Sequence, residues 1–193
     1  MGDRGGRPAV TTPHELAAVA QRLFVAAGFD STSIDDIARE AGISRRTFFR
    51  YFATKADVLF VESSAELDRL RQGLRQAPPG VPYGRVVISA VTAALHVPPE
   101  DHEWARQRAQ LILTVPALQA HAAVRFARWR SAATEYARTL APDDDLFAVA
   151  VGHAVLAATL AAHEYWITHP GTDLDDALAR MLDLLLPVEP APR

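Results

Sequence analysis

Apolar residues recur at every third or fourth position along almost the whole chain, and only short segments rich in proline or glycine interrupt this recurrence. A period between three and four residues places apolar side chains on one face of an α-helix, whereas a half-buried strand needs strict alternation. No hairpin turn dipeptide lies between alternating apolar residues, so no strand is expected. The pattern predicts an all-α fold of about nine helices, over residues 13–27, 34–41, 45–51, 55–75, 83–97, 100–115, 116–140, 146–168 and 173–186.

The composition excludes several classes of protein. The 193 residues include no cysteine, which excludes a disulfide scaffold, a thiolate nucleophile and any zinc site built on cysteine. The N-terminus has no apolar stretch of signal-peptide length. The most apolar segment, residues 146–162, is short for a membrane span and contains His153. We therefore expect a cytoplasmic protein with no membrane partner, in which this segment is a buried helix.

Two of the expected helices, separated by three residues, have the dimensions of a helix-turn-helix. Ser31, Thr32 or Ser33 would cap the first helix, and Ser44 would cap the second. Gly42 lies where the chain must turn sharply, which favours a positive φ. The apolar residues that would pack the two helices together are Ile34, Ile37, Ala38 and Ile43.

The second of these helices begins a basic segment. Residues 44–55 carry four basic side chains and no acidic one, whereas residues 61–193 carry twelve basic and sixteen acidic side chains. A local basic face on an acidic body is typical of a focused contact with a polyanion. Arginine can read guanine and a threonine methyl can meet a thymine methyl, while hydroxyl and ammonium groups suit phosphates. The candidate DNA-binding residues are Thr32, Ser33, Ser44, Arg45, Arg46, Thr47, Arg50, Tyr51 and Lys55.

Residues 32–59, TSIDDIAREAGISRRTFFRYFATKADVL, resemble the DNA-binding signature of the TetR family of repressors. Phe49 departs from the signature, because the family commonly has a phosphate-binding tyrosine there, and Tyr51 replaces a common histidine. A phenyl ring cannot donate a hydrogen bond to phosphate, so that role is not carried over to Phe49, and Tyr51 offers a hydroxyl nearby. The positions that match the signature are Thr32, Ile37, Ala38, Ala41, Gly42, Thr47, Phe52, Lys55 and Leu59.

The resemblance implies a homodimeric transcriptional regulator, a repressor rather than an enzyme, whose partners are a palindromic double-stranded DNA operator and a small-molecule inducer. It divides the chain into a disordered N-terminal arm, a helix-turn-helix DNA-binding domain, a ligand-binding and dimerisation domain, and a tail. These segments are residues 1–11, 12–56, 57–187 and 188–193.

The second domain resembles one subgroup of the family more closely. Trp104-x-x-x-Arg108, residues 111–122, Arg125 and Trp129-Arg130 are similar to regulators encoded with genes for biosynthesis of mycofactocin, a peptide-derived redox cofactor. Apolar helix faces edged by arginines suit an amphipathic anion such as an acyl-coenzyme A. A filled core with arginines on its surface is the alternative. The candidate ligand-binding residues are Trp104, Arg108, Ile112, His121, Arg125 and Trp129.

The last two expected helices carry stripes suited to a contact between subunits. Small residues that permit close packing form the first stripe, Ala150, Ala154, Ala157 and Ala161, and leucines form the second, Leu174, Leu178, Leu182 and Leu185. The family's usual four-helix interface implies that both stripes lie between subunits.

Other chemical interpretations are weaker. His169 follows His163 by six residues rather than four, so the two imidazoles do not have the spacing of a helical zinc site. Asp143, Asp144 and Asp145 would cap a helix or bind a cation. We expect no metal and no cofactor. The competing functional hypothesis is a helical enzyme, carrier or adaptor whose N-terminal segment is structural only, and salt-dependent operator binding distinguishes the two.

Overall fold

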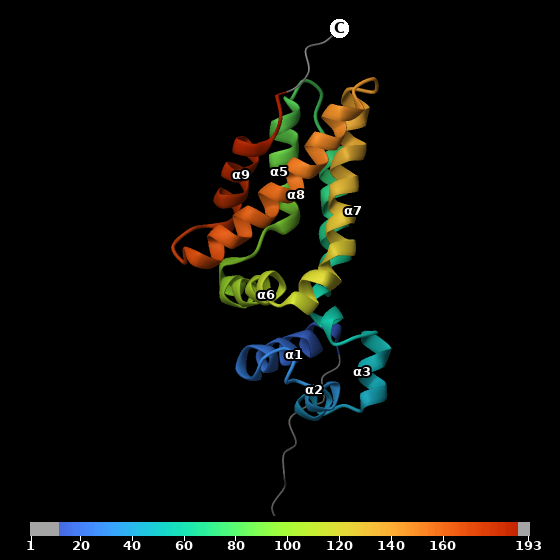
Figure 1. Ribbon diagram of the computed structural model, residues 1–193, viewed down its shortest axis with the longest axis vertical. Coiled ribbons are helices and arrows are strands. Elements are labelled where there is room, and N and C mark those ends of the chain that lie inside the picture. Colours follow the sequence, from blue (N-terminus) through green and yellow to red (C-terminus); the bar gives the residue numbers. More distant parts are fainter. Residues whose placement is uncertain (1–11, 189–193) are drawn as a thin grey trace, which may run out of the picture. The chain divides into compact units, whose positions relative to one another are not determined.

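The computed structural model describes residues 12–188, so the predicted arm, residues 1–11, and residues 189–193 of the predicted tail lie outside it. The described part contains nine α-helices, two short 3-10 helices and no strand (Figure 1), which confirms the all-α prediction. The α-helices are α1 (Pro13–Ala27), α2 (Ile34–Ala41), α3 (Arg45–Tyr51), α4 (Ser63–Arg75), α5 (Tyr83–Leu95), α6 (His102–Thr114), α7 (Pro116–Leu140), α8 (Asp145–Thr168) and α9 (Leu174–Leu185), and the 3-10 helices are η1 (Ala56–Phe60) and η2 (Pro99–Asp101). The chain divides into two compact units after Val61.

Reciprocal hydrogen bonds between side chains and backbone fix the starts of α1 and α2. The Thr12 hydroxyl accepts the N–H of Glu15 at 3.2 Å, and the Glu15 carboxylate accepts the N–H of Thr12 at 3.0 Å. Ser33 and Asp36 form the same capping box at the start of α2. These bonds satisfy amides that have no partner inside the helix. Of the three candidate caps for α2, Ser33 is therefore the residue that caps the helix.

The turn between α2 and α3 has the geometry that a helix-turn-helix requires. Gly42 ends α2 in the left-handed region, with φ of 68°, which glycine adopts without the penalty that a Cβ atom brings. The N–H of Ile43 then donates to the carbonyl of Ala38 at 3.0 Å. α1 packs against α2 and η1, and α2 packs against α3. Residues from all four elements form the buried core of this unit, chiefly Leu16, Phe24, Ile37, Phe48, Val58 and Leu59.

Three expected helices differ from the observed ones by two residues or more, and one of them, expected over residues 83–97, ends at Leu95. The segment expected to be one helix over residues 55–75 is the 3-10 helix η1 followed by α4. Val58, Leu59 and Phe60 are all buried, and three consecutive side chains cannot all lie on one face of a straight α-helix. The helix expected over residues 100–115 likewise begins as η2 and becomes α6 at His102.

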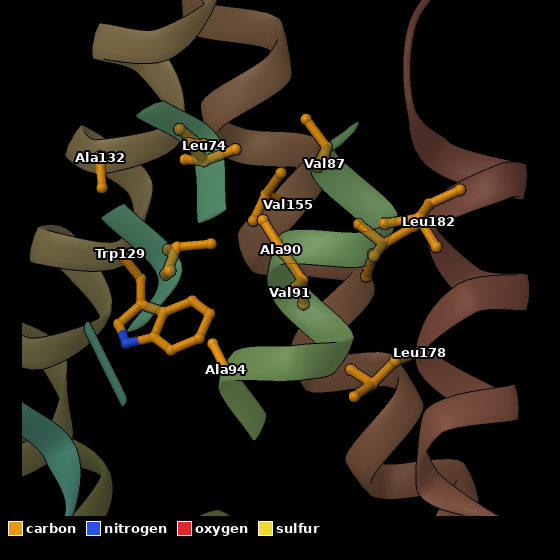
Figure 2. Close-up of a cluster of buried hydrophobic side chains, with 14 of the residues drawn as sticks. Leu74, Val87, Ala90, Val91, Ala94, Trp129, Ala132, Val155, Leu178 and Leu182 are labelled. Carbon is orange, nitrogen blue, oxygen red and sulfur yellow. The ribbon is translucent and has the colours of Figure 1, made fainter. Parts of the chain in front are cut away.

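The second unit is a bundle of the helices α4 to α9. α8 packs against α7 on one side and α9 on another, α5 packs against α4 and α9, and α6 contacts α7 and α8 (Figure 1). Their apolar faces meet in one continuous core, part of which is shown in Figure 2. The largest side chain that is fully buried there is Trp166 of α8.

The close approach of α7 and α8 depends on Gly152. A Cβ atom at this position would overlap the Thr134 hydroxyl and lie 2.9 Å from the backbone oxygen of Arg130. We expect Gly152→Ala to lower the free energy of unfolding by about 1–3 kcal/mol, because the backbone of α7 must move away. Gly84→Ala is the matched control, since its Cβ would touch only Leu186 at 4.0 Å. Urea unfolding followed by tryptophan fluorescence would measure both, and equal midpoints would contradict the prediction.

Candidate DNA-binding and ligand-binding sites

Helix α3 presents its basic side chains outward from a capped and anchored backbone. The Ser44 hydroxyl accepts the N–H of Thr47 at 3.1 Å and lies 2.9 Å from the Thr47 hydroxyl. Phe48 anchors the helix in the core with no exposed surface. The side chains of Arg45, Arg46 and Arg50 are exposed. The helix therefore offers three guanidinium groups to a ligand outside the unit.

The three arginines have different surroundings. Nη1 of Arg45 donates to both carboxylate oxygens of Asp35 on α2, at 3.1 and 3.0 Å, and its guanidinium lies 5.4 Å from the centre of the Phe49 ring. Arg50 donates to the Tyr51 hydroxyl at 3.0 Å and lies over that ring. Arg46 has no hydrogen bond or ion pair with other residues of the described chain. Of the three arginines of α3, Arg46 is therefore the one least restrained by contacts within the protein.

Two candidate DNA-binding residues serve the unit's own structure, which corrects the sequence interpretation. The Thr32 side chain is buried, and its hydroxyl donates to the carbonyl of Gly28 at 2.8 Å. The Lys55 ammonium donates to the carbonyls of Phe29 at 2.6 Å and Thr32 at 2.9 Å, and it lies 4.3 Å from the centre of the Phe29 ring. These bonds join η1 to the turn between α1 and α2. The buried Thr32 side chain is therefore not available to DNA, and we propose that the half-buried Lys55 has this structural role rather than a phosphate contact.

Ser33 is exposed, but its hydroxyl is engaged with Asp36 at 2.6 Å. Hydrogen bonds from the Ser33 side chain and backbone, and then from Arg39, lower the pKa of the Asp36 carboxyl. The carboxylate is therefore ionised at neutral pH and holds the cap at the start of α2. The hydroxyls of Ser33 and Ser44 thus cap α2 and α3, and a DNA contact of either residue stays a prediction.

Two of the candidate ligand-binding residues lie together in the second unit. Arg108 of α6 donates to Glu66 of α4 at 3.1 Å, and both side chains are largely buried. The Arg108 guanidinium also lies 5.2 Å from the centre of the Trp104 ring. Burial lowers the pKa of the nearby His163 imidazole on α8, which is therefore neutral at pH 7. Its Nδ1 lies 2.8 Å from the carbonyl oxygen of Thr159, so this nitrogen carries the proton.

The other four candidate ligand-binding residues lie on α6 and α7. Trp129 is buried in the bundle core (Figure 2). Trp104 is partly buried and packs against the same core. Arg125 donates to the carbonyl of His121 one turn earlier on α7, and Ile112 is half-buried on α6. Glu66 and His163 were missed from the sequence, because no spacing pattern relates α4 or α8 to α6. Among residues 12–188, no three histidine, aspartate or glutamate side chains come together as a metal ion requires.

Both units match known proteins. A family model for bacterial regulatory proteins of the tetR family matches residues 16–61, and a model for the MftR C-terminal domain matches residues 81–190. A relative from Mycobacterium tuberculosis, named MftR as a regulator of mycofactocin biosynthesis, is 33% identical over 184 residues, which cover 94% of this chain and 93% of the relative. The chain belongs to the TetR family. It is therefore a transcriptional regulator, and the hypothesis of an enzyme is set aside.

Solved structures of TetR-like regulators share the fold. A regulator from Mesorhizobium loti aligns with a TM-score of 0.58 at 17% identity, covering 90% of this chain and 94% of that chain. A regulator from Rhodococcus sp. Rha1 aligns with a TM-score of 0.54 at 21% identity, covering 91% and 96%. At these identities the likeness concerns the fold alone, and it confirms the helix-turn-helix domain followed by a helical domain.

Leu178 and Leu182 of α9, which were expected between TetR subunits, lie inside the protomer. Leu178 and Leu182 have no exposed surface and point from α9 toward α5 (Figure 2). A side chain buried in the core of its own subunit is not available to a second one, so these two assignments are corrected. The exposed leucines of α9 are Leu184 and Leu185, and Leu185 belongs to the expected stripe.

The alanines of α8 are placed differently. Ala157 is exposed, while Ala150, Ala154 and Ala161 are half-buried. By length and composition α8 could cross a membrane, yet less than half of its most apolar stretch is buried in the protomer. One side of α8 packs into the bundle core through Val151, Val155 and other residues. Its uncovered side carries the exposed apolar residues Leu146, Val149 and Ala157 together with the exposed His153.

Proposed function

We propose that this TetR-family chain is a repressor that binds a palindromic operator as a homodimer and is released by a small amphipathic ligand. The observation that carries the DNA-binding part is the exposed row of arginines on α3, set on a helix that its cap and the buried Phe48 hold in place. Such a helix fits a major groove about 12 Å wide. The regulator would act in the cytoplasm, where bacterial DNA lies.

The proposed DNA contacts follow from the chemistry of each side chain. Arg45 and Arg46, in the first turn of α3, would read guanine, because a guanidinium can donate two bonds to its O6 and N7. Arg50 and Tyr51, at the end of α3, would bind phosphate together, since their side chains already lie 3.0 Å apart. The Thr47 methyl group would meet a base edge. Ser33 and Ser44 would bring the amides of two helix N-termini near the backbone of the DNA.

The name of the M. tuberculosis relative supports mycofactocin biosynthesis genes as the target. The test is selection of genomic fragments that the purified chain binds, then footprinting, then a reporter gene fused to the bound promoter. We expect an inverted repeat, binding that weakens steeply with salt, and reporter expression that falls when the regulator is present. Expression that rises instead would identify an activator, and failure to select any fragment would overturn the proposed function.

The homodimer is proposed from the uncovered side of α8. A helix that is mostly apolar is normally buried, whereas the bundle leaves one face of α8 uncovered. Leu146, which is 81% exposed, Val149 and Ala157 lie on this face, and Leu184 and Leu185 add exposed apolar surface on α9. A second copy of the chain that packs α8 and α9 against the same surfaces would bury all of these side chains.

The ligand site is proposed around Arg108. Its guanidinium is largely buried between Trp104 and Glu66, and a buried guanidinium binds phosphate or carboxylate strongly. The apolar bundle around it would take a hydrocarbon tail, so a fatty acyl-coenzyme A fits both requirements. To release DNA, the ligand must bind the DNA-incompetent state more tightly than the competent one.

We expect operator release by acyl-coenzyme A to strengthen with chain length, by about 0.8 kcal/mol per methylene at most, until the site is full. Removing Arg108 alone would leave Glu66 buried without its partner, so the test uses the double variant Glu66→Gln/Arg108→Met. Operator release by acyl-coenzyme A should weaken in this double variant, while its affinity for the operator stays unchanged. Arg128→Met, which removes an exposed arginine of α7, is the control. Release that ignores chain length, or that persists in the double variant, would refute this ligand.

A further inference from the structure

Phe49 is a large apolar residue that is not part of the core. It lies on α3 between Arg45 and Arg50, and its side chain is 44% exposed. Its neighbour Phe48 already fills the core position, with no exposed surface, and meets the Phe49 ring edge-to-face at 5.6 Å between centroids. Phe49 is thus held by a buried neighbour while much of its own ring faces outward, in the middle of a basic surface.

The major groove limits what such a ring can bind. A phenyl group neither donates nor accepts a conventional hydrogen bond, so it can read neither a base edge by hydrogen bonding nor a phosphate. The apolar group that base edges present in the major groove is the 5-methyl group of thymine. An exposed phenylalanine on a DNA-reading helix therefore has thymine as its chemical match.

Arg45 lies beside the Phe49 ring and is held there by an ion pair with Asp35. Its Nη1 is occupied by the two oxygens of Asp35, while its Nε and Nη2 are not used in that ion pair. The guanidinium is at the same time 5.4 Å from the Phe49 ring centre. Asp35 and Phe49 together restrict where the remaining donors of Arg45 can point, although an exposed ion pair by itself adds little stability.

We propose that Phe49 determines sequence specificity by packing against the 5-methyl group of one thymine in each half-site, and that Asp35 is a positioning residue that directs Arg45 to an adjacent guanine. The inference rests on the proposed binding of DNA by α3. The family's usual tyrosine at this position binds phosphate through its hydroxyl, which Phe49 lacks. The inference gives Phe49 a different role, the recognition of a base.

The test removes the methyl group from the DNA rather than from the protein. Each thymine of a selected operator is replaced in turn by deoxyuridine, which differs only in lacking the 5-methyl group. We expect wild-type affinity to fall about fourfold per substituted half-site at one thymine position, the factor that corresponds to one buried methyl group at about 0.8 kcal/mol. Phe49→Ala should bind the thymine operator more weakly and show no difference at that position, whereas Phe49→Tyr should keep the difference.

Asp35 is tested through discrimination rather than affinity. Asp35→Asn should reduce the preference for guanine beside that thymine, measured as the ratio of affinities for the operator and for a version with adenine there. Asp30→Asn removes the same charge from an exposed carboxylate that has no ion pair with Arg45, so it should leave the ratio unchanged. An equal change of the affinity ratio in both variants would show that only the lost negative charge matters, and would overturn the positioning role of Asp35.

The outcomes separate this inference from the function on which it rests. A wild-type chain that binds no selected fragment would overturn both. Operator binding with no sensitivity to any deoxyuridine would overturn the thymine contact alone. A Phe49→Ala variant that loses affinity yet keeps the full deoxyuridine effect would place the ring against sugar or protein, and would likewise reject the thymine contact.

Discussion

Lys55→Met is expected to unfold the DNA-binding unit at a lower urea concentration than the helical bundle. The substitution keeps the apolar stem but removes the ammonium, and with it the charged hydrogen bonds to the carbonyls of Phe29 and Thr32. Hydrogen bonds to a charged group contribute about 1.5–3 kcal/mol each, so we expect this unit to lose about 3 kcal/mol. All three tryptophans lie after Val61. Circular dichroism should therefore show an early loss of helix that tryptophan fluorescence does not follow.

Arg46→Met is the matched control for Lys55→Met. It removes one basic group from the same unit, but from an exposed position with no partner among the described residues. We expect native stability for Arg46→Met, with operator affinity lower by about 1–3 kcal/mol. Native stability in Lys55→Met, with a salt dependence reduced by about one charge per subunit, would instead return Lys55 to the phosphate contact that the family signature implies.

Local sequence was sufficient to predict the helix-turn-helix. The boundaries of α2 and α3 depend on Ser33, Gly42 and Ser44, and each of these acts on residues at most five positions away. Capping and turn chemistry of this kind can be read from spacing alone. The same reasoning does not extend to Lys55, whose partners lie 23 to 26 residues earlier in the chain. Because its ammonium could equally have bound phosphate, only the fold decides between the two.

The bundle shows a similar division between periodicity and partners. The stripe that includes Leu178 and Leu182 was identified correctly as an apolar helix face. Periodicity indicates that such a face is covered, but not whether the same subunit or another one covers it. The ion pair of Glu66 with Arg108 joins residues 42 positions apart, and no local pattern relates them. The helices could therefore be recognised from the sequence, whereas the long-range partners around the proposed ligand site could not.

Ala157→Asp is expected to convert the proposed dimer to a monomer. Ala157 is exposed on the side of α8 that faces away from the bundle core. A carboxylate there costs the single subunit little, but between two subunits it would be buried twice with no counter-charge, at several kcal/mol. One helix-turn-helix alone makes too few contacts to hold its half-site, so operator binding should disappear with the dimer. Light scattering gives the mass, and gel shift gives the binding.

The control for Ala157→Asp is the same substitution on an exposed face of another helix. Ala123→Asp on α7 introduces an identical charge at an exposed alanine and should leave both mass and operator affinity unchanged. Unfolding midpoints of the two variants, taken at low protein concentration, would show whether either substitution damages the protomer itself. An intact dimer in Ala157→Asp would remove this side of α8 from the subunit contact. The exposed Leu184 and Leu185 of α9 would then be the surface to test next, because the protomer leaves both side chains uncovered.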